Sequence, residues 1–257
     1  MHRSARAILA IVALAGCASD GGGGAKPLDL VTAPATLKIE VVGTYPHDET
    51  SWTEGFELHD GQLLESAGRE GQSSLRLANP TTGEITDVIP VDADLYAEGV
   101  TVVGDRALQL TWKNETLLVT PLPDLDTAAV TEQTGAYDGE GWGLCYDGTD
   151  VVMSNGSAQL QFRSPETREL RRSGPVTLAG QPVINLNELE CVDGEVWANV
   201  WLTTTIVAID PATGAVTATA DVAELVPERY RNDNNAVANG IAHDPATGHF
   251  WLTGKLW

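Results

Sequence analysis

The stretch Glu54-Gly55-Phe56 recurs four times along the chain in altered form, and this recurrence decides the fold. The later copies are Glu98-Gly99-Val100, Trp142-Gly143-Leu144, Glu188-Leu189-Glu190 and Asn239-Gly240-Ile241. They start about 44, 44, 46 and 51 residues apart, which is the spacing of β-propeller blades of about four short strands each. Five copies therefore predict an all-β, five-bladed β-propeller.

Turn sequences between the copies support this prediction. Asn79-Pro80-Thr81-Thr82-Gly83 and two later versions of it, at 210–214 and 244–248, combine a proline that presets φ with a glycine that accepts positive φ. One segment departs from the pattern: Asp221, residues 223–225 and residues 229–231 are typical of a short helix. We expect this helix as an insertion before the fifth copy.

The first residues predict export. Basic residues at His2, Arg3 and Arg6 precede an apolar stretch, residues 7–15, that is too short to span a bilayer. It ends in Leu14-Ala15-Gly16-Cys17, the pattern of a bacterial lipobox, in which the cysteine carries the lipid. An ordinary secretory signal with an incidental cysteine is the alternative.

We therefore divide the chain into a lipoprotein signal peptide at 1–16, a flexible glycine-rich tether at 17–33 and a propeller at 34–257. The expected location is the bacterial cell envelope, anchored by lipid to the membrane on the periplasmic side or the cell surface. Cys145 and Cys191 remain in this oxidising compartment. Both lie in apolar strand contexts, so we expect buried free thiols, with a disulfide as the alternative.

The charge balance excludes one class of partner. The chain has 36 acidic and 15 basic residues, and the resulting net charge of −21 repels nucleic acid. A hydrophobic content of 42% is ample for a buried core. We expect a monomer with no nucleic-acid partner.

The position of the repeats also predicts a site. In a propeller, the loops that enter the innermost strands crowd one mouth of the central channel. The residues at that place in successive copies are Glu54, Glu98, Glu140 with Trp142, Asn187 with Glu188, and Asn239. Carboxylates, amides and an indole that are far apart in sequence should therefore meet in space.

Eight phrases in order give the sequence a resemblance to the glutaminyl-peptide cyclotransferase family of plants and bacteria. They are Tyr45-Pro46-His47-Asp48, Glu65-Ser66-Ala67-Gly68 with Ser73-Ser74-Leu75-Arg76, Tyr96-Ala97-Glu98-Gly99, Leu110-Thr111-Trp112-Lys113, Gly139-Glu140-Gly141-Trp142-Gly143-Leu144, Leu186-Asn187-Glu188-Leu189-Glu190, Trp197-Ala198-Asn199-Val200-Trp201 and Thr253-Gly254-Lys255-Leu256-Trp257. The resemblance runs from Tyr45 to Trp257. It implies a five-bladed propeller that converts the N-terminal glutamine of peptides and proteins to pyroglutamate and releases ammonia.

The resemblance also implies the site residues. Glu98 is the expected proton acceptor and then donor, and Asn187 and Lys255 are expected to stabilise charge on the substrate amide oxygen. Trp112, Trp142 and Trp201 are expected to wall the substrate pocket, and Trp52 takes the place of a further aromatic residue. Glu54 stands where the family prefers glutamine, and a second carboxylate near Glu98 would raise one of the two pKa values.

Two expectations concern the ends of the propeller. The family continues past the phrase that ends at Trp257 with a further strand, so the last blade is expected to be incomplete. The strand at 37–44, before the first copy, is expected to close the ring by joining that blade.

Alternatives remain for the acidic residues and for the function. Glu140, Glu188 and Glu190 could hold the substrate ammonium, bind a cation or pair with backbone amides. Catalysis is expected to need no cofactor, whereas a structural calcium ion is possible and no metal ligands are assigned. The rival functions are a calcium-dependent propeller hydrolase of the lactonase kind and a non-catalytic, peptide-binding propeller. His47 is interpreted as a turn residue.

Overall fold

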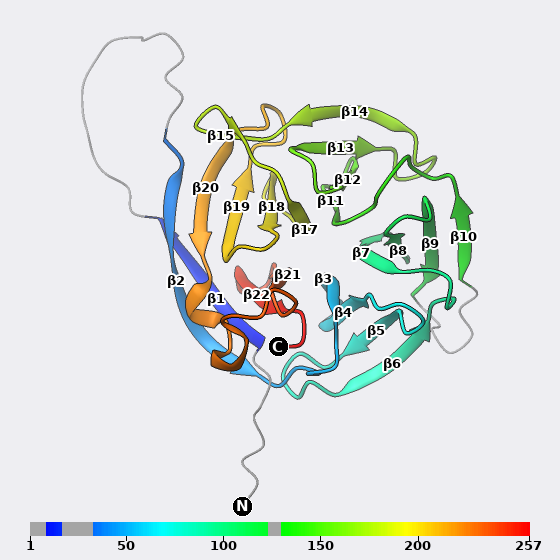
Figure 1. Cartoon of the computed structure of the whole chain (residues 1–257), viewed down its shortest axis with the longest axis horizontal. Helices are drawn as coiled ribbons and strands as arrows, with labels where there is room; N and C mark the ends of the chain where they lie inside the picture. Colours follow the sequence, from blue (N-terminus) through cyan, green and yellow to red (C-terminus); the bar gives the residue numbers. More distant parts are fainter. Residues whose placement is uncertain (1–8, 17–32, 123–129) are drawn as a thin grey trace, which may run out of the picture.

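The computed structural model describes residues 9–16, 33–122 and 130–257. Cys17 and most of the predicted tether lie outside these residues. Sheets arranged around a central axis make up the fold (Figure 1). It is an all-β, propeller-like fold, as predicted.

Three sheets have four antiparallel strands each. The first contains β3 (Thr53–His59), β4 (Gln62–Ala67), β5 (Ser74–Ala78) and β6 (Ile85–Pro90). The second contains β7 (Ala97–Val103), β8 (Arg106–Thr111), β9 (Thr116–Pro121) and β10 (Thr131–Thr134). The third contains β11 (Leu144–Tyr146), β12 (Val151–Met153), β13 (Gln159–Arg163) and β14 (Leu170–Pro175). A two-stranded sheet, β15 (Thr177–Leu178) with β16 (Gln181–Pro182), follows the third.

The remaining strands form one eight-stranded sheet in the order β17-β18-β19-β20-β2-β1-β22-β21. Its members are β17 (Leu186–Val192), β18 (Glu195–Val200), β19 (Thr205–Ile209), β20 (Val216–Asp221), β2 (Ala35–Tyr45), β1 (Leu9–Gly16), β22 (His249–Gly254) and β21 (Ala238–Asp244). The prediction of five separate blades is therefore wrong at the level of sheets, because the described residues form four large sheets. The reason is that β2 pairs in parallel with β20 and joins two runs of four strands into one sheet.

The ring is closed differently from the prediction. β2 lies in the same sheet as β21 and β22, but it pairs with β1 rather than with β22. β1 covers the stretch that the sequence analysis interprets as the apolar part of an export signal, and its Val12 is fully buried in the core. That interpretation stays a prediction, because nothing in the arrangement of β1 tests how the chain is processed.

The predicted inserted helix is not confirmed. Two single-turn 3₁₀ helices stand in its place, η2 (Ala223–Leu225) and η3 (Glu228–Tyr230). Pro227 lies between them in an extended conformation and cannot donate a helical hydrogen bond, so the turns cannot merge. In the part of the chain described, no helix is long and apolar enough to cross a membrane.

The core consists of apolar clusters between neighbouring sheets. Leu110 of β8 packs with Leu144 and Met153 of the next sheet, for example, and all three are buried. The innermost strands contact one another in the order β3, β7, β11, β17, β21 and back to β3. The prediction of free thiols is wrong: Cys145 of β11 and Cys191 of β17 form a disulfide with a Cα–Cα distance of 5.5 Å. Adjacent inner strands approach more closely than we expected.

Candidate active site

Glycines at the start of the inner strands let the site residues crowd together. A Cβ atom at Gly99 would collide with the backbone of Trp142 and Leu144, and one at Gly143 would overlap the carbonyl oxygen of Asn187. Each glycine thus allows one inner strand to lie directly against the backbone of the next. The residues beside these glycines are consequently brought to the same end of the channel.

A pocket of about 230 Å³ opens at this place. All eight residues predicted to be catalytic or substrate-binding line it: Trp52, Glu54, Glu98, Trp112, Trp142, Asn187, Trp201 and Lys255. Three residues that the sequence analysis did not select also line it, namely Tyr96, Asn234 and Asn235. The predicted convergence of distant residues is thus what the structure has.

Glu54 and Glu98 form a buried pair of carboxyl groups in this pocket, with exposed fractions of 2% and 6%. Glu54 Oε1 accepts a hydrogen bond of 2.6 Å from Lys255 Nζ and one of 3.1 Å from the Tyr96 hydroxyl. Glu54 Oε2 accepts from Asn239 Nδ2 at 3.4 Å. Glu54 is therefore the carboxyl group that its surroundings hold in place.

The two carboxyl groups shift each other's titration. Burial and then the neighbouring Glu54 carboxylate raise the pKa of Glu98 well above its ordinary value, although Lys255 opposes the shift. Burial also raises the pKa of Glu54, and Lys255 and Tyr96 oppose that rise. Since Lys255 is hydrogen-bonded to Glu54, we assign the shared proton to Glu98.

Glu140 holds two of the predicted pocket walls. Its Oε2 accepts hydrogen bonds from Trp112 Nε1 at 2.9 Å and from Trp142 Nε1 at 3.0 Å. Partial burial acts against ionisation, but these two bonds and Lys113 lower the pKa of Glu140. One carboxylate thus fixes two indole planes.

The other two walls are fixed by aromatic contacts and by a neighbouring cation. Trp142 and Trp201 meet edge to face with ring centroids 5.6 Å apart. Lys255 Nζ lies 5.6 Å from the centroid of Trp52. Asn187 is buried, and its Oδ1 has no hydrogen-bond partner among the described residues. Asn187 also lines the pocket, so its side-chain amide is close to the place where a substrate would bind.

Glu188 and Glu190 do not join this group. Glu188 accepts hydrogen bonds from the backbone N–H groups of Phe56 and Ile241, at 3.2 and 2.9 Å, and Glu190 accepts from that of His243 at 2.8 Å. They brace inner strands around the channel, which was one of the three alternatives. Among the residues that the structure describes, no group of three or more His, Cys, Asp or Glu side chains is placed to hold a metal ion.

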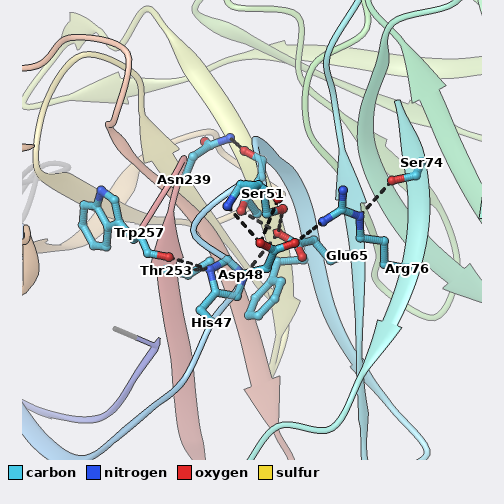
Figure 2. Close-up of polar contacts among 12 residues, drawn as sticks. His47, Asp48, Ser51, Glu65, Ser74, Arg76, Asn239, Thr253 and Trp257 are labelled. Carbon is cyan, nitrogen blue, oxygen red and sulfur yellow. Dashed lines mark hydrogen bonds and ion pairs between the residues drawn. The ribbon is translucent and has the colours of Figure 1, made fainter. Parts of the chain in front are cut away.

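A second buried network, which the sequence did not predict, joins His47, Glu65 and Trp257 (Figure 2). His47 is not a simple turn residue: its Nε2 lies 3.2 Å from Glu65 Oε1, and its Nδ1 lies 3.0 Å from the carbonyl oxygen of Trp257. Glu65 also accepts hydrogen bonds from Ser51 and Thr53, at 2.5 and 2.6 Å. The network therefore ties the start of β3, which carries Glu54, to the segment that carries Lys255.

His47 and Glu65 shift each other's pKa in this network. Burial alone would lower the pKa of His47, but the facing Glu65 carboxylate outweighs it and the pKa is raised. Burial alone would raise the pKa of Glu65, but His47 and the two hydroxyl donors lower it to about 2. The two pKa shifts therefore have opposite directions, and each favours the charged form of its own group. The separate phrases that contain His47, Glu65 and Trp257 gave no signal that these residues meet.

The channel mouth of this propeller-like fold holds a carboxyl pair, a lysine and a wall of tryptophans. Such a pocket is typical of an enzyme rather than of a scaffold propeller. The comparisons with known proteins agree with this. The family model of glutamine cyclotransferase matches residues 8–257. The chain is 33% identical to glutaminyl-peptide cyclotransferase of Arabidopsis thaliana over 224 residues, which covers 86% of this chain and 69% of the plant protein.

A solved structure gives the same answer. The crystal structure of Myxococcus xanthus glutaminyl cyclase matches with a TM-score of 0.75 and 35% identity, over 83% of this chain and 90% of that one. This chain belongs to the glutamine cyclotransferase family. The resemblance found in the eight sequence phrases is thereby confirmed.

Proposed function

We propose that this chain is a glutaminyl-peptide cyclotransferase that converts the N-terminal glutamine of peptides and proteins to pyroglutamate. The observation that carries the proposal is the Glu54–Glu98 pair, with Lys255, in a tryptophan-lined pocket of a chain of this family. The rival functions have less support, because the matching family model, the plant relative and the Myxococcus structure are all named for the cyclisation of glutamine.

The reaction forms a bond between the α-amine nitrogen and the side-chain amide carbon, and it breaks the bond from that carbon to the amide nitrogen, which leaves as ammonia. Both reactants belong to one residue, so the pocket's main task is to hold the side chain curled. Correct positioning of tethered reactants can be worth about 7–11 kcal/mol. Trp112, Trp142 and Trp201 form flat walls for this purpose. Glu140 and the edge-to-face contact keep them in place.

One proton must move from the attacking amine to the leaving nitrogen, and Glu98 is placed to move it. Because Glu98 holds the shared proton, it first donates that proton to the leaving nitrogen and then takes the proton from the new ring nitrogen. This order is the reverse of the one expected from the sequence. Glu98 ends in its starting state, so one carboxyl group serves every turnover.

Charge that grows on the amide oxygen needs donors. Lys255 uses one N–H on Glu54, and an ammonium group has two more. Asn187 offers an amide N–H₂ and, through its unpartnered Oδ1, an acceptor for the substrate amine. We assign the oxygen to Lys255 and Asn187 together.

The test is to incubate the protein with a glutamine-initiated tetrapeptide and to measure ammonia and the mass of the peptide. We expect one ammonia per peptide, with and without a chelator. The same peptide with an acetylated N-terminus lacks the attacking amine and should not react. Absence of ammonia from the unblocked peptide would show that the proposal is wrong.

We further propose that the eight-stranded sheet acts as two blades, which makes the propeller five-bladed. Two facts support this: the repeat occurs five times, and residues of the two four-strand runs pack face to face, as Ile206 and Leu252 do in one cluster. Their arrangement then matches that between separate sheets elsewhere in the ring.

Export and lipid anchoring through Cys17 are also proposals. The lipobox-like residues 14–17 and the Cys145–Cys191 disulfide support them, since disulfides persist in oxidising compartments. Cleavage before Cys17 would remove β1 and leave β2 and β22 without their shared neighbour. The mass of the mature N-terminus and the release of a Cys17→Ser variant from membranes would test both points.

A further inference from the structure

A second cavity of about 720 Å³ adjoins the candidate active site. It lies between the Leu202–Thr205 segment, which leads into β19, and the segment that contains η2 and η3. Asn234 lines both this cavity and the tryptophan-walled pocket. Trp201 and Leu202 are also consecutive, with Trp201 in the first cavity and Leu202 in the second. The two cavities therefore share one lining residue, Asn234, and the consecutive residues Trp201 and Leu202 line one cavity each.

Leu202 is held in an unusual conformation at this boundary. Its φ is +65°, in the left-handed region that favours glycine, yet it is a leucine with 48% of its surface exposed. The turn around it is fixed, because Thr203 donates to the carbonyl oxygen of Val200 through both its backbone N–H, at 3.1 Å, and its hydroxyl, at 2.6 Å. The fold thus holds an apolar side chain out at the rim.

A second exposed apolar side chain is linked to Trp201 through the backbone, although it lines neither cavity. Ile184 is 60% exposed and precedes Asn185, whose carbonyl oxygen accepts a hydrogen bond of 2.8 Å from the backbone N–H of Trp201. Leu202 thus follows Trp201 in the chain, and Ile184 precedes the residue that accepts the Trp201 backbone hydrogen bond. Most other exposed large apolar residues lie on strands far from the pocket, such as Val88 on β6 and Leu170 on β14.

We propose that the second cavity binds the residues that follow the N-terminal glutamine, with Leu202 contacting the side chain of the second residue, so that a large apolar residue there is preferred. This inference rests on the proposed function. A glutamine held in the first pocket must send its peptide chain out past the boundary residues, and Asn234 and Leu202 mark the way into the adjoining cavity. Its charged lining is mixed, with Glu224, Arg231 and Asp233, so charge alone does not choose the occupant.

The experiment compares kcat/KM for glutaminamide, Gln-Leu-Ala-Ala and Gln-Ser-Ala-Ala. For the wild-type protein we expect Gln-Leu-Ala-Ala to exceed Gln-Ser-Ala-Ala by about tenfold, the usual value of one apolar contact. The Leu202→Gly variant suits its φ and should fold. In it, the ratio of the two tetrapeptides should fall to about one. The control Leu170→Ala removes a similarly exposed leucine from β14 and should keep the wild-type ratio.

Each result has one meaning. Equal rates for the two tetrapeptides in the wild-type protein, or an unchanged ratio in Leu202→Gly, would overturn this inference while cyclisation stands. If none of the three substrates releases ammonia with the wild-type protein, the proposed function fails and the inference fails with it. Should Leu202→Gly not fold by circular dichroism, Leu202→Asn replaces it, because asparagine also tolerates positive φ.

Discussion

Glu54 stands beside Glu98 in the pocket, and its surroundings show what a carboxylate at this position does. A carboxylate here accepts from Lys255 and Tyr96 and stands beside Glu98. Burial and then this negative neighbour raise the pKa of Glu98. We therefore expect Glu54 to act on catalysis through Glu98, by raising the pKa of Glu98.

Glu54→Gln should move the pH profile. Without the negative neighbour the pKa of Glu98 falls, so the protonated form that donates to the leaving amide nitrogen is lost at lower pH. The alkaline limb of kcat should shift to lower pH by on the order of one unit. It is measured as kcat against pH with a glutamine-initiated peptide.

Tyr96→Phe is the matched control for this shift. It removes the hydroxyl that bonds Glu54 but keeps the Glu54 carboxylate, so the alkaline limb should stay near its wild-type position. An unmoved limb in Glu54→Gln would show that the two carboxyl groups do not share a proton.

The sequence predicted eight catalytic or substrate-binding residues, which stand beside repeat glycines or in family phrases. All eight line one pocket. It did not predict Asn234 and Asn235, because a polar run after a short insertion has no repeat to place it. The sequence also did not predict the contact of His47 with Glu65. Those residues are 18 positions apart in different phrases, and only the packing of β4 against the preceding loop brings them together.

Among the strands, the contact between β11 and β17 is the one that a covalent bond fixes. The Cys145–Cys191 disulfide spans 46 residues of sequence. Replacing both cysteines by alanine should lower the free energy of unfolding by about 2–4 kcal/mol, because the cross-link restricts the unfolded chain. Denaturant unfolding of the double variant measures this.

Chemical reduction of the wild-type protein is the control, and it should produce a loss of similar size. A thiol titration that finds two free cysteines in protein from an oxidising compartment would contradict the assignment. The sequence left this pairing open, since the spacing of two cysteines carries no information about the separation of neighbouring inner strands.

Strands and turns were predictable because period-2 patterns and Pro-Gly turns are local signals. Two features were not local. The insertion at 221–231 has helical composition, but Pro227 divides it into two 3₁₀ turns. The residues of β1 predict part of an export signal, because an apolar run is typical both of such a signal and of a buried strand. The strand is evident only from the pairing of β1 with β2 and β22.

Across the whole molecule, buried carboxyl groups set the dependence of stability on pH. Burial and nearby carboxylates raise the pKa of Glu188 and Glu190, and burial raises that of Glu57 to about 7. A carboxyl group with a raised pKa binds more protons in the folded state, so its contribution to stability falls as pH rises from about 4.5. Glu65 acts oppositely: its lowered pKa means that stability is lost as pH falls from about 4.5 toward 2.

The unfolding temperature should therefore be highest near about pH 5 and decline on both sides. Calorimetry across pH measures it. Glu57→Gln removes one titrating group and should reduce the loss between about pH 5 and pH 8 by on the order of 1–3 kcal/mol. Glu132→Gln, an exposed site on β10, should keep the wild-type slope. A stability that rises steadily to pH 8 would contradict this account.

The overall architecture was predictable from the repeat, because each copy carries the same strand and turn signals. The joining of two runs into one sheet was not, since it depends on the parallel contact between Ala35–Leu37 of β2 and the outer strand β20. Much of the site followed from the architecture: Glu54, Glu98, Trp142 and Asn187 open or precede copies of the repeat and line one pocket. Glu188 does not, because it accepts hydrogen bonds from backbone N–H groups of the inner strands.

The most direct test of the central claim is the turnover of a glutamine-initiated peptide by Glu98→Gln. This change keeps the size of the side chain but removes its proton transfer, so kcat should fall by roughly 10²–10⁴ while KM changes little. Circular dichroism should show the wild-type fold. If the folded Glu98→Gln variant releases ammonia at nearly the wild-type rate, then Glu98 does not move the proton and the proposed mechanism is wrong.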